Sequence, residues 1–454
     1  MKSTSLRLLM EGLTDSEVPD IEISECTTDS RSAKPGSVFV AIKGDTFDGN
    51  DFAQSALDNG AAAAVVTRGD APGMIRVNDT RDAYCAMAGN YRNQFSPLVV
   101  AVTGSVGKTT TKEMVAAIFS SFEPETLKNL ENRNNEIGLP ETVFRMDEDT
   151  KLAVFEMGMS GLGEISRLSR CVKPHAGIIT YIGVSHIEML GSRENILKAK
   201  LEITDGMDSD GFLVINGDDP MLMGAKESIP VRVFTFGTDN QDCDVIATDI
   251  EYYGLSTSFL IVDKEYGTFK AQIPCSGIHN VRDAVSAFTL ATRLGFDPQK
   301  SAQALSSYAP AGMRQRFREV RGMTIIEDCY NAAPESMESS LRILSDLSCD
   351  GKRIAVLGDM LELGSVSEEA HRKVGALAGR FGIDTVLCYG VLSKHIAEEA
   401  ERNGVREVRH FDDKTEMAGY LSEIAAKGDT VLFKASRGMA LEDVIQIFYG
   451  DDIK

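Results

Sequence analysis

The most regular hydrophobic pattern in the chain begins at Leu98. Residues 98–102 are apolar and mostly β-branched, as in a strand that is buried on both faces. After a polar stretch that contains glycine, apolar side chains recur at positions 114, 115, 118, 119 and 122, which is the spacing of one helix face. The pattern therefore predicts a strand, a tight loop and a helix in direct succession.

Short apolar runs alternate with helical patterns in the rest of the chain. Further strands are expected at 37–42 and 61–66, at 152–155, 177–182 and 212–215, and at 323–326, 354–357, 385–388 and 430–433. Between 244 and 274 apolar and polar residues alternate, which predicts antiparallel strands appended to the second group. Elsewhere the rhythm of strand and helix favours parallel sheets with crossover helices.

The loop after the first strand has the composition of a phosphate-binding loop. Two glycines let the backbone turn tightly at a helix N-terminus, where N–H groups and the helix dipole favour an anion. The lysine would reach the outer phosphates of a nucleotide, and the first threonine hydroxyl would hold Mg²⁺. Two residues, rather than four, separate the glycines, so this is a shortened form of the motif. Its members are Gly104, Ser105, Val106, Gly107, Lys108, Thr109 and Thr110.

A chain of 454 residues is too long for one hydrophobic core. We expect an α/β protein of three domains. A small N-terminal α/β domain would span 1–97, a central P-loop ATPase-like domain with a mostly parallel sheet would span 98–309, and a Rossmann-like domain would span 310–454. The stretches 92–97 and 308–312 are expected to join them.

The net charge limits the partners to be expected, and the cysteines indicate the cell compartment. A net charge of −21 argues against nucleic acid or an anionic membrane as the main partner, although it permits anionic small molecules. The eight cysteines are scattered, with no close pair at metal-ligand spacing, as is typical of reduced cytosolic thiols. No apolar run approaches a membrane span, and Glu11 interrupts the only candidate signal peptide. We expect a cytoplasmic protein, and we take it to be a monomer, although no pattern reports its oligomeric state.

Two side chains follow neighbouring strands of the central domain. Glu156 ends one strand, and His186 comes a few residues after the next. Because the carboxyl ends of parallel strands meet at one edge, both are expected beside the nucleotide, where they could hold Mg²⁺. An ordinary strand-end acid and a surface histidine explain the pattern equally well. Lys198, Lys200 and Glu202 lie on a predicted helix, and their pattern alone is typical of a solvated face.

Polar clusters also follow the strands of the third domain, at 328–331, 358–360 and 434–437. Each alone would be a loop, but three clusters on one sheet edge indicate a second ligand site. No G-x-G-x-x-G follows the first strand of this domain, so a dinucleotide is not indicated. In the N-terminal domain, the polar stretch 28–31 is as typical of a turn as of a binding site.

Taken together, the ordered motifs resemble the Mur ligase family, which builds the peptide of peptidoglycan. The resemblance covers nearly the whole chain. The motifs are DSR at 29 with FVAIKG and DGNDF, TGSVGKTT at 103, NRNNEIGLP at 132, EMG at 156, SHIEMLGS at 185, AKLEI at 199, GIHN at 277, GMR at 312, DCYNAAPESM at 328, LGDMLELG at 357 and KASRGMALE at 434.

The resemblance implies an ATP-dependent amide ligase that joins D-Ala-D-Ala to UDP-N-acetylmuramoyl-tripeptide through an acyl phosphate. The product would be the pentapeptide precursor of peptidoglycan. The motifs leave open whether the third peptide residue is lysine or diaminopimelate. The N-terminal domain would bind the UDP-sugar peptide, and the C-terminal domain would bind the dipeptide.

The resemblance also implies a role for each matching residue. The Mg²⁺ ligands would be Thr109, Glu156, His186 and a carbamylated Lys200; with Lys108, the last three would also be catalytic. Asp29, Ser30 and Arg31 would lie near the uridine diphosphate, and Asn134 and Asn135 near the peptide substrates. The expected nucleotide contacts outside the loop are Asn280, Arg314 and Asp328. The residues expected to face ATP or the dipeptide are Tyr330, Asn331, Lys434, Ser436 and Arg437.

Three positions depart from the family pattern. Ala333 stands where the family has the second asparagine of Tyr-Asn-Ala-Asn-Pro, Ala435 replaces the glycine of Lys-Gly-Ser-Arg, and Asp283 replaces a common asparagine. The first two bear on contacts with the dipeptide and leave the reaction type unchanged.

Other functions are weighed against this one. The family branch that adds a diamino acid is expected to carry Asp-Asn-Pro-Arg, which is absent, and folate polyglutamate ligases share the phosphate loop without the DSR domain. A P-loop binding protein driven by nucleotide hydrolysis is the alternative from another class. A GTP switch would need Asn-Lys-x-Asp, which is absent, and a nucleotide-gated scaffold would leave the polar edge of the third domain unexplained.

Overall fold

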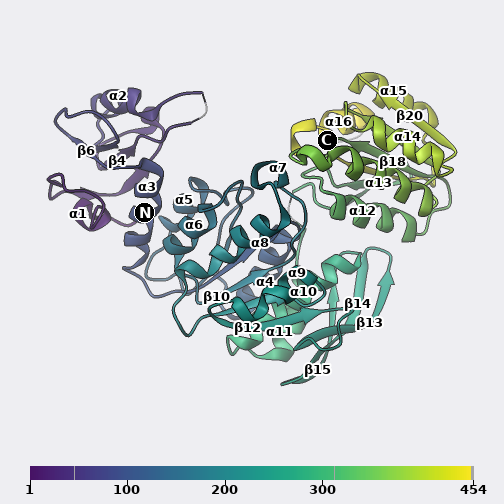
Figure 1. The fold of residues 1–454 in the computed structure, drawn as a ribbon, viewed down its shortest axis with the longest axis horizontal. Helices are drawn as coiled ribbons and strands as arrows, with labels where there is room; N and C mark the ends of the chain where they lie inside the picture. The colour runs from purple at the N-terminus through teal and green to yellow at the C-terminus, as the bar shows by residue number, and fades with distance from the viewer. Residues whose placement is uncertain (45, 311, 451–454) are drawn as a thin grey trace.

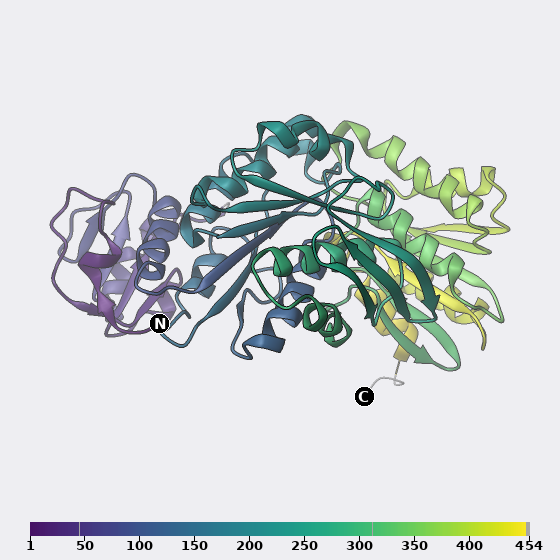
Figure 2. The same ribbon diagram turned by 90° about the horizontal axis from the view of Figure 1, so that it is seen from below.

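The computed structural model describes residues 1–44, 46–310 and 312–450. Three α/β parts follow one another along the molecule, with the N-terminal part at one end and the C-terminal part at the other (Figures 1 and 2). This architecture confirms the predicted fold class. Ala311, within the expected joint, and residues 451–454 lie outside the described residues.

The N-terminal part contains a parallel sheet in the order β3-β4-β5-β6 and the antiparallel pair β1-β2. Its strands are β1 (Thr4–Ser5), β2 (Glu22–Ile23), β3 (Glu25–Thr27), β4 (Ser37–Val40), β5 (Ala63–Val66) and β6 (Met74–Arg76). Its helices are α1 (Leu6–Leu9), α2 (Ala53–Asp58) and α3 (Thr80–Arg92). The strands at 37–42 and 61–66 are therefore confirmed, in slightly shorter form.

The central sheet has the order β15-β14-β13-β12-β11-β10-β7-β9-β8. Pairing is parallel from β13 to β8, and the predicted antiparallel strands β13 to β15 extend one edge. The strands are β7 (Leu98–Thr103), β8 (Leu127–Lys128), β9 (Leu152–Glu156), β10 (Ala176–Ile179), β11 (Phe212–Asn216), β12 (Arg232–Gly237), β13 (Val245–Tyr253), β14 (Ser256–Asp263) and β15 (Gly267–Ile273). The helices are α4 (Lys108–Phe122), α5 (Gly138–Val143), α6 (Glu164–Val172), α7 (Ile187–Leu190), α8 (Arg193–Leu201), α9 (Pro220–Ala225), α10 (Ile278–Arg293) and α11 (Pro298–Ala304).

The C-terminal sheet has the order β16-β17-β21-β18-β19-β20, and all pairs except β16-β17 are parallel. The strands are β16 (Arg316–Val320), β17 (Met323–Glu327), β18 (Arg353–Gly358), β19 (Thr385–Tyr389), β20 (Glu407–Phe411) and β21 (Thr430–Lys434). The helices are α12 (Pro334–Asp346), α13 (Ser367–Arg380), α14 (Lys394–Arg402), α15 (Lys414–Ile424) and α16 (Glu442–Tyr449).

Sequence patterns missed eight strands. The short strands β1, β2, β3 and β6 of the N-terminal part were not expected, and neither were β8, β12, β16 and β20. β8 is only two residues long, and β16 and β20 are sheet edges whose alternating or polar side chains lack the apolar run of a central strand. Edge strands depend on pairing with a neighbour more than on their own composition, which explains why these were missed.

Alternate residues of β7 bury opposite faces of the central sheet. Val99 and Ala101 belong to a core with helices α5, α6 and α8, whereas Val100 and Val102 belong to a core with α4 and α10. The first of these cores continues without a break into the N-terminal part, where Tyr84 and Tyr91 of α3 join it. Separate cores cover the two faces of the C-terminal sheet. The N-terminal part is thus packed firmly against the centre, and the C-terminal part is the more independent body.

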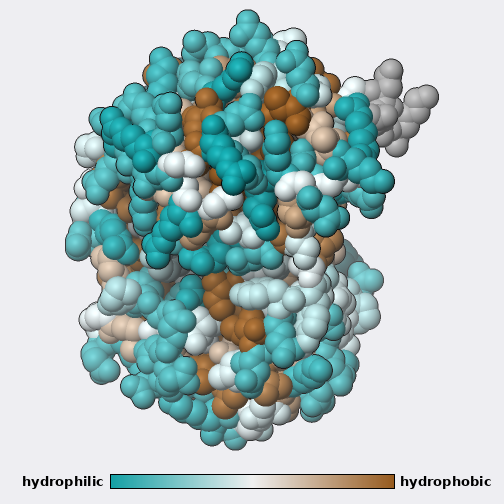
Figure 3. All heavy atoms as spheres, turned by 90° about the vertical axis from the view of Figure 1, so that its right-hand side faces the viewer, coloured by the Kyte–Doolittle hydropathy of each residue, from teal (hydrophilic) through white to brown (hydrophobic). Residues whose placement is uncertain are grey.

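The surface on the C-terminal side is mainly hydrophilic, with brown hydrophobic side chains in scattered small groups (Figure 3). All eight cysteines are free thiols, and six are buried, as composition led us to expect. Across the described residues, no helix combines the length and the apolar character that a membrane crossing requires.

Candidate active site

The phosphate loop joins the end of β7 to the start of α4, as predicted. Gly104 has a φ of +151° and Gly107 a φ of +83°, both in the region that favours glycine. A Cβ on Gly104 would stand 1.8 Å from Thr180 Oγ1, and one on Gly107 would stand 2.6 Å from Asp283 Oδ1. The loop is therefore enclosed so closely that neither position accepts a side chain.

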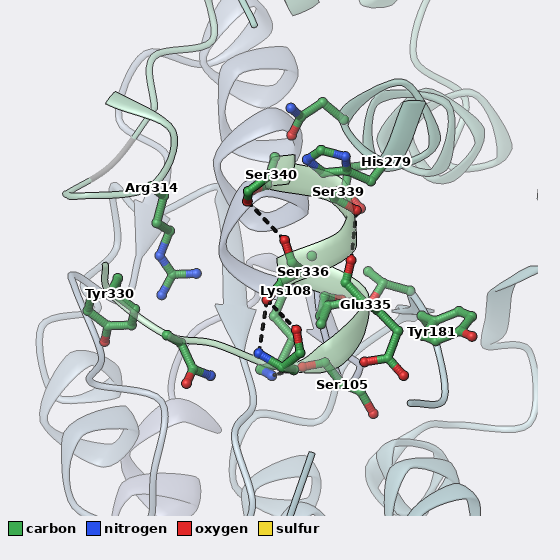
Figure 4. A pocket seen from close by; sticks show the side chains of 18 of the residues that line it. Ser105, Lys108, Tyr181, His279, Arg314, Tyr330, Glu335, Ser336, Ser339 and Ser340 are labelled. Carbon is green, nitrogen blue, oxygen red and sulfur yellow. Dashed lines mark hydrogen bonds between the residues drawn. The ribbon is translucent and has the colours of Figure 1, made fainter. Parts of the chain in front are cut away.

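Neighbouring groups fix the shape of this loop. Thr180 Oγ1 donates a hydrogen bond to the carbonyl oxygen of Val106 at 2.5 Å, and Ser105 Oγ accepts one from Gly183 N–H at 2.9 Å. The Lys108 ammonium group donates to the carbonyl oxygens of Gly104 and Ser105 at 2.8 and 3.3 Å (Figure 4). Burial lowers the pKa of Lys108, and the Glu156 carboxylate opposes that shift. The lysine thus lies where it can exchange its carbonyl acceptors for phosphate oxygens.

Glu156 is held at the end of β9 by three neighbouring side chains. Its Oε2 accepts a hydrogen bond from Thr109 Oγ1 at 2.6 Å, and its Oε1 accepts one from Asn134 Nδ2 at 2.7 Å. Asn129 holds the backbone of the same residue through its amide group, at 2.8 and 3.1 Å. The carboxylate is only 1% exposed. The expected meeting of Thr109 and Glu156 is therefore present, and Asn134 joins them.

These oxygen donors suit Mg²⁺. The ion prefers hard oxygen ligands and commonly takes one or two protein carboxylates, with phosphate oxygens and water completing its shell. Within the described part of the chain, no group of three or more His, Cys, Asp or Glu side chains could hold a metal by itself. Thr109 and Glu156 therefore fit an ion that a bound nucleotide helps to coordinate.

Lys200 is buried within α8, whereas its neighbour Lys198 is exposed. The alternative of a solvated charged face is therefore wrong for Lys200 and right for Lys198. Burial lowers the pKa of Lys200 well below its usual value, and the nearby charge of Lys108 lowers it further. An amine in such a place is more readily neutral than a surface lysine.

His186 lies at the boundary between the central and C-terminal parts. It precedes α7 with a φ of +64°, and its Nδ1 is 2.6 Å from the carboxylate of Glu362. The hydrogen bond from His186 lowers the pKa of Glu362. Glu362 belongs to the predicted motif at 357, but the pattern did not single it out as a partner of His186.

One of the expected nucleotide contacts, Asn280, lies at the start of α10. Asn280 Nδ2 donates to the carbonyl oxygen of Ser276 at 2.6 Å and to Gln315 Oε1 at 2.8 Å. The other end of the Gln315 amide lies 2.5 Å from His279 Nε2. Burial lowers the pKa of His279 to about 4, so the neutral ring accepts this hydrogen bond. Gln315 and His279 were both missed, because neither stands in a motif with a recognised chemical role.

Arg314 and Tyr330 form one face of the site. The Arg314 guanidinium lies 4.0 Å from the centroid of the Tyr330 ring, in cation–π contact. Both side chains point into the cavity in Figure 4. The pair joins the linker after residue 310 to the loop that follows β17.

Asp328 and Lys434 form a buried ion pair on the C-terminal edge, at 2.7 Å. Ser340 Oγ also donates to Asp328 Oδ2, at 2.6 Å, and Lys434 donates to the carbonyl oxygen of Asn331 at 3.2 Å. Ser436 Oγ instead accepts from Leu361 N–H at 3.0 Å, so it supports a neighbouring loop.

A cavity of about 1300 Å³ lies between the central and C-terminal parts. It brings together most of the predicted site residues from both parts. The predicted residues that line it are Ser105, Val106, Gly107, Lys108, Thr110, Asn134, Asn135, Glu156, His186, Asn280, Arg314, Asp328, Tyr330, Asn331, Lys434 and Arg437. Gly104, Thr109, Lys200 and Ser436 are absent from that lining.

The three N-terminal candidates lie elsewhere, on the N-terminal part. Asp29 accepts hydrogen bonds from the Arg31 side chain and backbone, and these lower the pKa of Asp29 to about 2. The backbone carbonyl of Ser30 accepts from Asn59 Nδ2 at 3.1 Å. The structure therefore does not bring Asp29, Ser30 or Arg31 into the cavity.

Asp283 was noted as a departure from the family pattern, and it lies directly behind the phosphate loop. The residue is 6% exposed, and its Oδ2 has no hydrogen-bond partner among the described residues. Burial raises the pKa of Asp283 to about 8, while Thr111 and Arg282 oppose the shift. A protonated acid at this position has nearly the shape of the asparagine it replaces.

The amino-acid sequence is similar to that of known proteins along most of its length. Three family profiles match the chain: "Mur ligase family, catalytic domain" over residues 22–122, "Mur ligase middle domain" over 102–291 and "Mur ligase, glutamate ligase domain" over 313–437. The chain is 40% identical to the UDP-N-acetylmuramoyl-tripeptide–D-alanyl-D-alanine ligase of Bacillus subtilis, over 92% of both chains.

Two solved structures superpose on nearly the whole chain. A crystal structure of MurF from Acinetobacter baumannii is 28% identical and superposes with a TM-score of 0.89 over 99% of both chains. The MurF ligase of Thermotoga maritima in complex with ADP is 30% identical, with a TM-score of 0.85 over 94% of this chain and 97% of that one. These similarities span all three parts of the fold.

The raised pKa of Asp283 predicts how one substitution changes stability with pH. The folded state holds a proton that the unfolded state releases at about pH 4, so wild-type stability should fall by about 1.4 kcal/mol per pH unit from there to about pH 8. Asp283→Asn removes this dependence, and its thermal midpoint should exceed that of the wild type increasingly as pH rises through this range. Calorimetry from about pH 5 to about pH 8 measures the difference.

The exposed Asp242 of the same part provides a matched control, because Asp242→Asn removes an aspartate without a buried proton. A constant difference between Asp283→Asn and the wild type across this pH range would show that Asp283 is ionised in the fold.

Proposed function

The chain belongs to the Mur ligase family, and we propose that its reaction takes place in the cavity between its central and C-terminal parts. The protein is an ATP-dependent amide ligase that joins D-Ala-D-Ala to UDP-N-acetylmuramoyl-tripeptide in peptidoglycan synthesis. Similarity to dipeptide-adding enzymes along the whole chain disfavours both a diamino-acid-adding ligase and a binding protein driven by nucleotide hydrolysis.

The assignment of the active site rests on one observation. The cavity has the phosphate loop and Glu156 on one wall and the Asp328–Lys434 pair on the other. A ligase must bring two anions together, since the peptide carboxylate attacks the γ-phosphate of ATP. A wall of N–H groups and cations on the central part, facing a polar wall on a second part, suits that task.

The phosphate loop and Lys108 would hold the ATP phosphates. Lys108 would offset the negative charge that gathers as the carboxylate oxygen attacks and ADP leaves. The resulting acyl phosphate has a carbonyl carbon that the dipeptide amine can attack, with phosphate as the leaving group. Asn280 and Arg314 line the same cavity and would contact the nucleotide.

Mg²⁺ would be held by Thr109 and Glu156, and it would supply charge neutralisation at the phosphates. His186 is a further candidate ligand, and it would have to leave the Glu362 carboxylate to take that role. Competition between Glu362 and the ion would then couple metal binding to the position of the C-terminal part.

Lys200 would complete the metal environment as a carbamate. A plain lysine beside Lys108 and a metal would add positive charge, whereas a carbamate presents anionic oxygens. Carbamylation requires a neutral amine, and burial lowers the pKa of Lys200 in the direction that favours it.

Each of the three parts would bind a different substrate. Residues 1–97 would bind the UDP-linked tripeptide, with Asp29, Ser30 and Arg31 near the diphosphate; residues 98–309 would bind ATP; and residues 310–454 would bind the dipeptide. Asn134 and Asn135 would lie near the peptide substrates. Tyr330, Asn331, Lys434, Ser436 and Arg437 would form or support the dipeptide side.

A substrate survey tests the activity. Purified protein with ATP, Mg²⁺ and UDP-linked tripeptides ending in lysine or diaminopimelate should release ADP when D-Ala-D-Ala is added, and mass spectrometry should find the pentapeptide. Lys108→Ala should lower this rate by a factor of about 10² or more, because an essential transition-state charge is lost.

Lys151→Ala, at an exposed lysine of the same part, should keep the wild-type rate. ADP release without a new amide bond, or near-normal turnover by Lys108→Ala with circular dichroism unchanged, would contradict the assignment.

Lys200 supplies a second prediction. Native mass spectrometry in bicarbonate buffer should find the mass of one added carboxyl group, and Lys200→Ala should remove both that mass and most of the activity. Lys198→Ala, two residues away on the exposed side, should keep both. Full activity in Lys200→Ala would exclude a role at the metal.

Domain closure is the third prediction from the proposed function. The N-terminal and central parts share a core, so movement is expected at the joint after residue 308. The radius of gyration from X-ray scattering should decrease when a non-hydrolysable ATP analogue and the UDP-linked tripeptide are added together. Identical scattering profiles with and without both ligands would rule closure out.

A further inference from the structure

The side chain of Glu335 reaches from the C-terminal part toward the phosphate loop. It is the second residue of α12, and its Oε1 lies 2.8 Å from the position that a Cβ on Gly183 would occupy. The N–H of that glycine donates to Ser105 Oγ, within the phosphate loop. Figure 4 shows the carboxyl group beside Tyr181 and near Ser105. An acid from one part therefore stands next to the phosphate loop of another.

The side chain of Glu335 is half-buried, and its carboxyl group is incompletely bonded. Its Oε2 is shielded from solvent and has no hydrogen-bond partner in the part of the chain that the structure describes. Buried polar atoms without partners are rare, because each costs about 1–3 kcal/mol. This oxygen is therefore available to a ligand group that donates a hydrogen bond.

Other acids that line the cavity near the reacting groups are already engaged. Glu156 accepts from Thr109 and Asn134, Asp328 is paired with Lys434, and Glu362 is paired with His186. Asp283 also has an unpartnered oxygen, but it lies behind Gly107 in the central part. Glu335 alone among these five combines a free oxygen with a place on the C-terminal wall.

The second half of the reaction needs a group that accepts a proton. An α-amino group has a pKa of about 7.7–8.0, so at neutral pH most of the dipeptide carries an ammonium group with no lone pair. An acyl phosphate can be attacked only by the neutral amine. A carboxylate near the phosphates can both attract the ammonium and take its proton.

We propose that Glu335 binds the ammonium group of the incoming dipeptide and acts as the general base for amide formation. This rests on the proposed function. One proton passes from the ammonium to Glu335 Oε2, and the freed lone pair attacks the acyl carbon. The tetrahedral species then collapses: the carbon–oxygen bond to phosphate breaks, phosphate leaves with the electron pair, and the second amine proton passes to it.

The surroundings of Glu335 support this role. Burial raises the pKa of Glu335, which makes its carboxylate a better base. The charged groups that oppose this shift are Arg193 of α8 and Lys373 of α13, and the titratable Tyr181 faces the acid from the central part. The backbone N–H groups of Glu335 and Val184 also oppose the shift, and an arriving ammonium would add the charged partner that Oε2 lacks.

The experiment compares two nucleophiles in the full-length enzyme with ATP, Mg²⁺ and UDP-linked tripeptide. Glu335→Gln keeps the size of the side chain and removes the base. With D-Ala-D-Ala at neutral pH, kcat/KM should fall about 10²- to 10⁴-fold, and the loss should shrink as pH rises and the free amine becomes abundant. With hydroxylamine, which is largely unprotonated at neutral pH, product formation should stay near the wild-type rate.

The hydroxylamine reaction also reports that the variant folds and activates the tripeptide. Glu335→Asp should restore part of the dipeptide rate, and Glu416→Gln, at an exposed acid of the same part outside the cavity, should resemble the wild type. Equal losses with both nucleophiles, or a wild-type dipeptide rate in Glu335→Gln, would overturn the proposal. A wild-type enzyme that forms no amide with D-Ala-D-Ala would instead reject the proposed function.

Discussion

The close enclosure of the phosphate loop is the constraint on which the rest of the site depends. Gly104 lies against Thr180 and Gly107 lies against Asp283, with no room for a Cβ at either position. Because the loop cannot shift, Lys108 and Thr109 begin α4 at a defined place beside Glu156. Gly183, bonded to Ser105, extends the same arrangement toward the C-terminal part. The packing of two glycines therefore sets the positions of Lys108 and Thr109 for their proposed roles.

The distribution of hydrophobic cores determines which parts can move. One core runs from the N-terminal part through α3 into the centre, so the site for the UDP-linked substrate and the phosphate loop are expected to move as a unit. The C-terminal sheet has cores of its own. Its contacts with the centre include polar side chains around the cavity, such as His186 with Glu362 and Asn280 with Gln315. Polar contacts of this kind exchange readily for contacts with ligands, which suits a joint that must open and close.

Sequence reasoning located the elements with a strong local signal. Strand β7, the phosphate loop and helix α4 followed from a buried apolar run, two glycines and a helical repeat, and each signal is contained within a few residues. The edge strands β16 and β20 were missed because their stability comes from a neighbouring strand. Lys200 shows the same limit at a single residue, since its helix looked like a solvated face and tertiary packing buried it.

The sequence by itself determined the α/β fold, the phosphate loop and the motifs at the strand ends, because these depend on local composition and on the order of the elements. Only the tertiary structure decided which of these motifs meet. It brought Glu156 to Thr109, paired His186 with Glu362, left Asp29 to Arg31 outside the cavity, and placed Glu335 beside the loop of another part. Contacts between distant residues depend on how sheets pack and how domains dock. They produce no repeating pattern in the sequence.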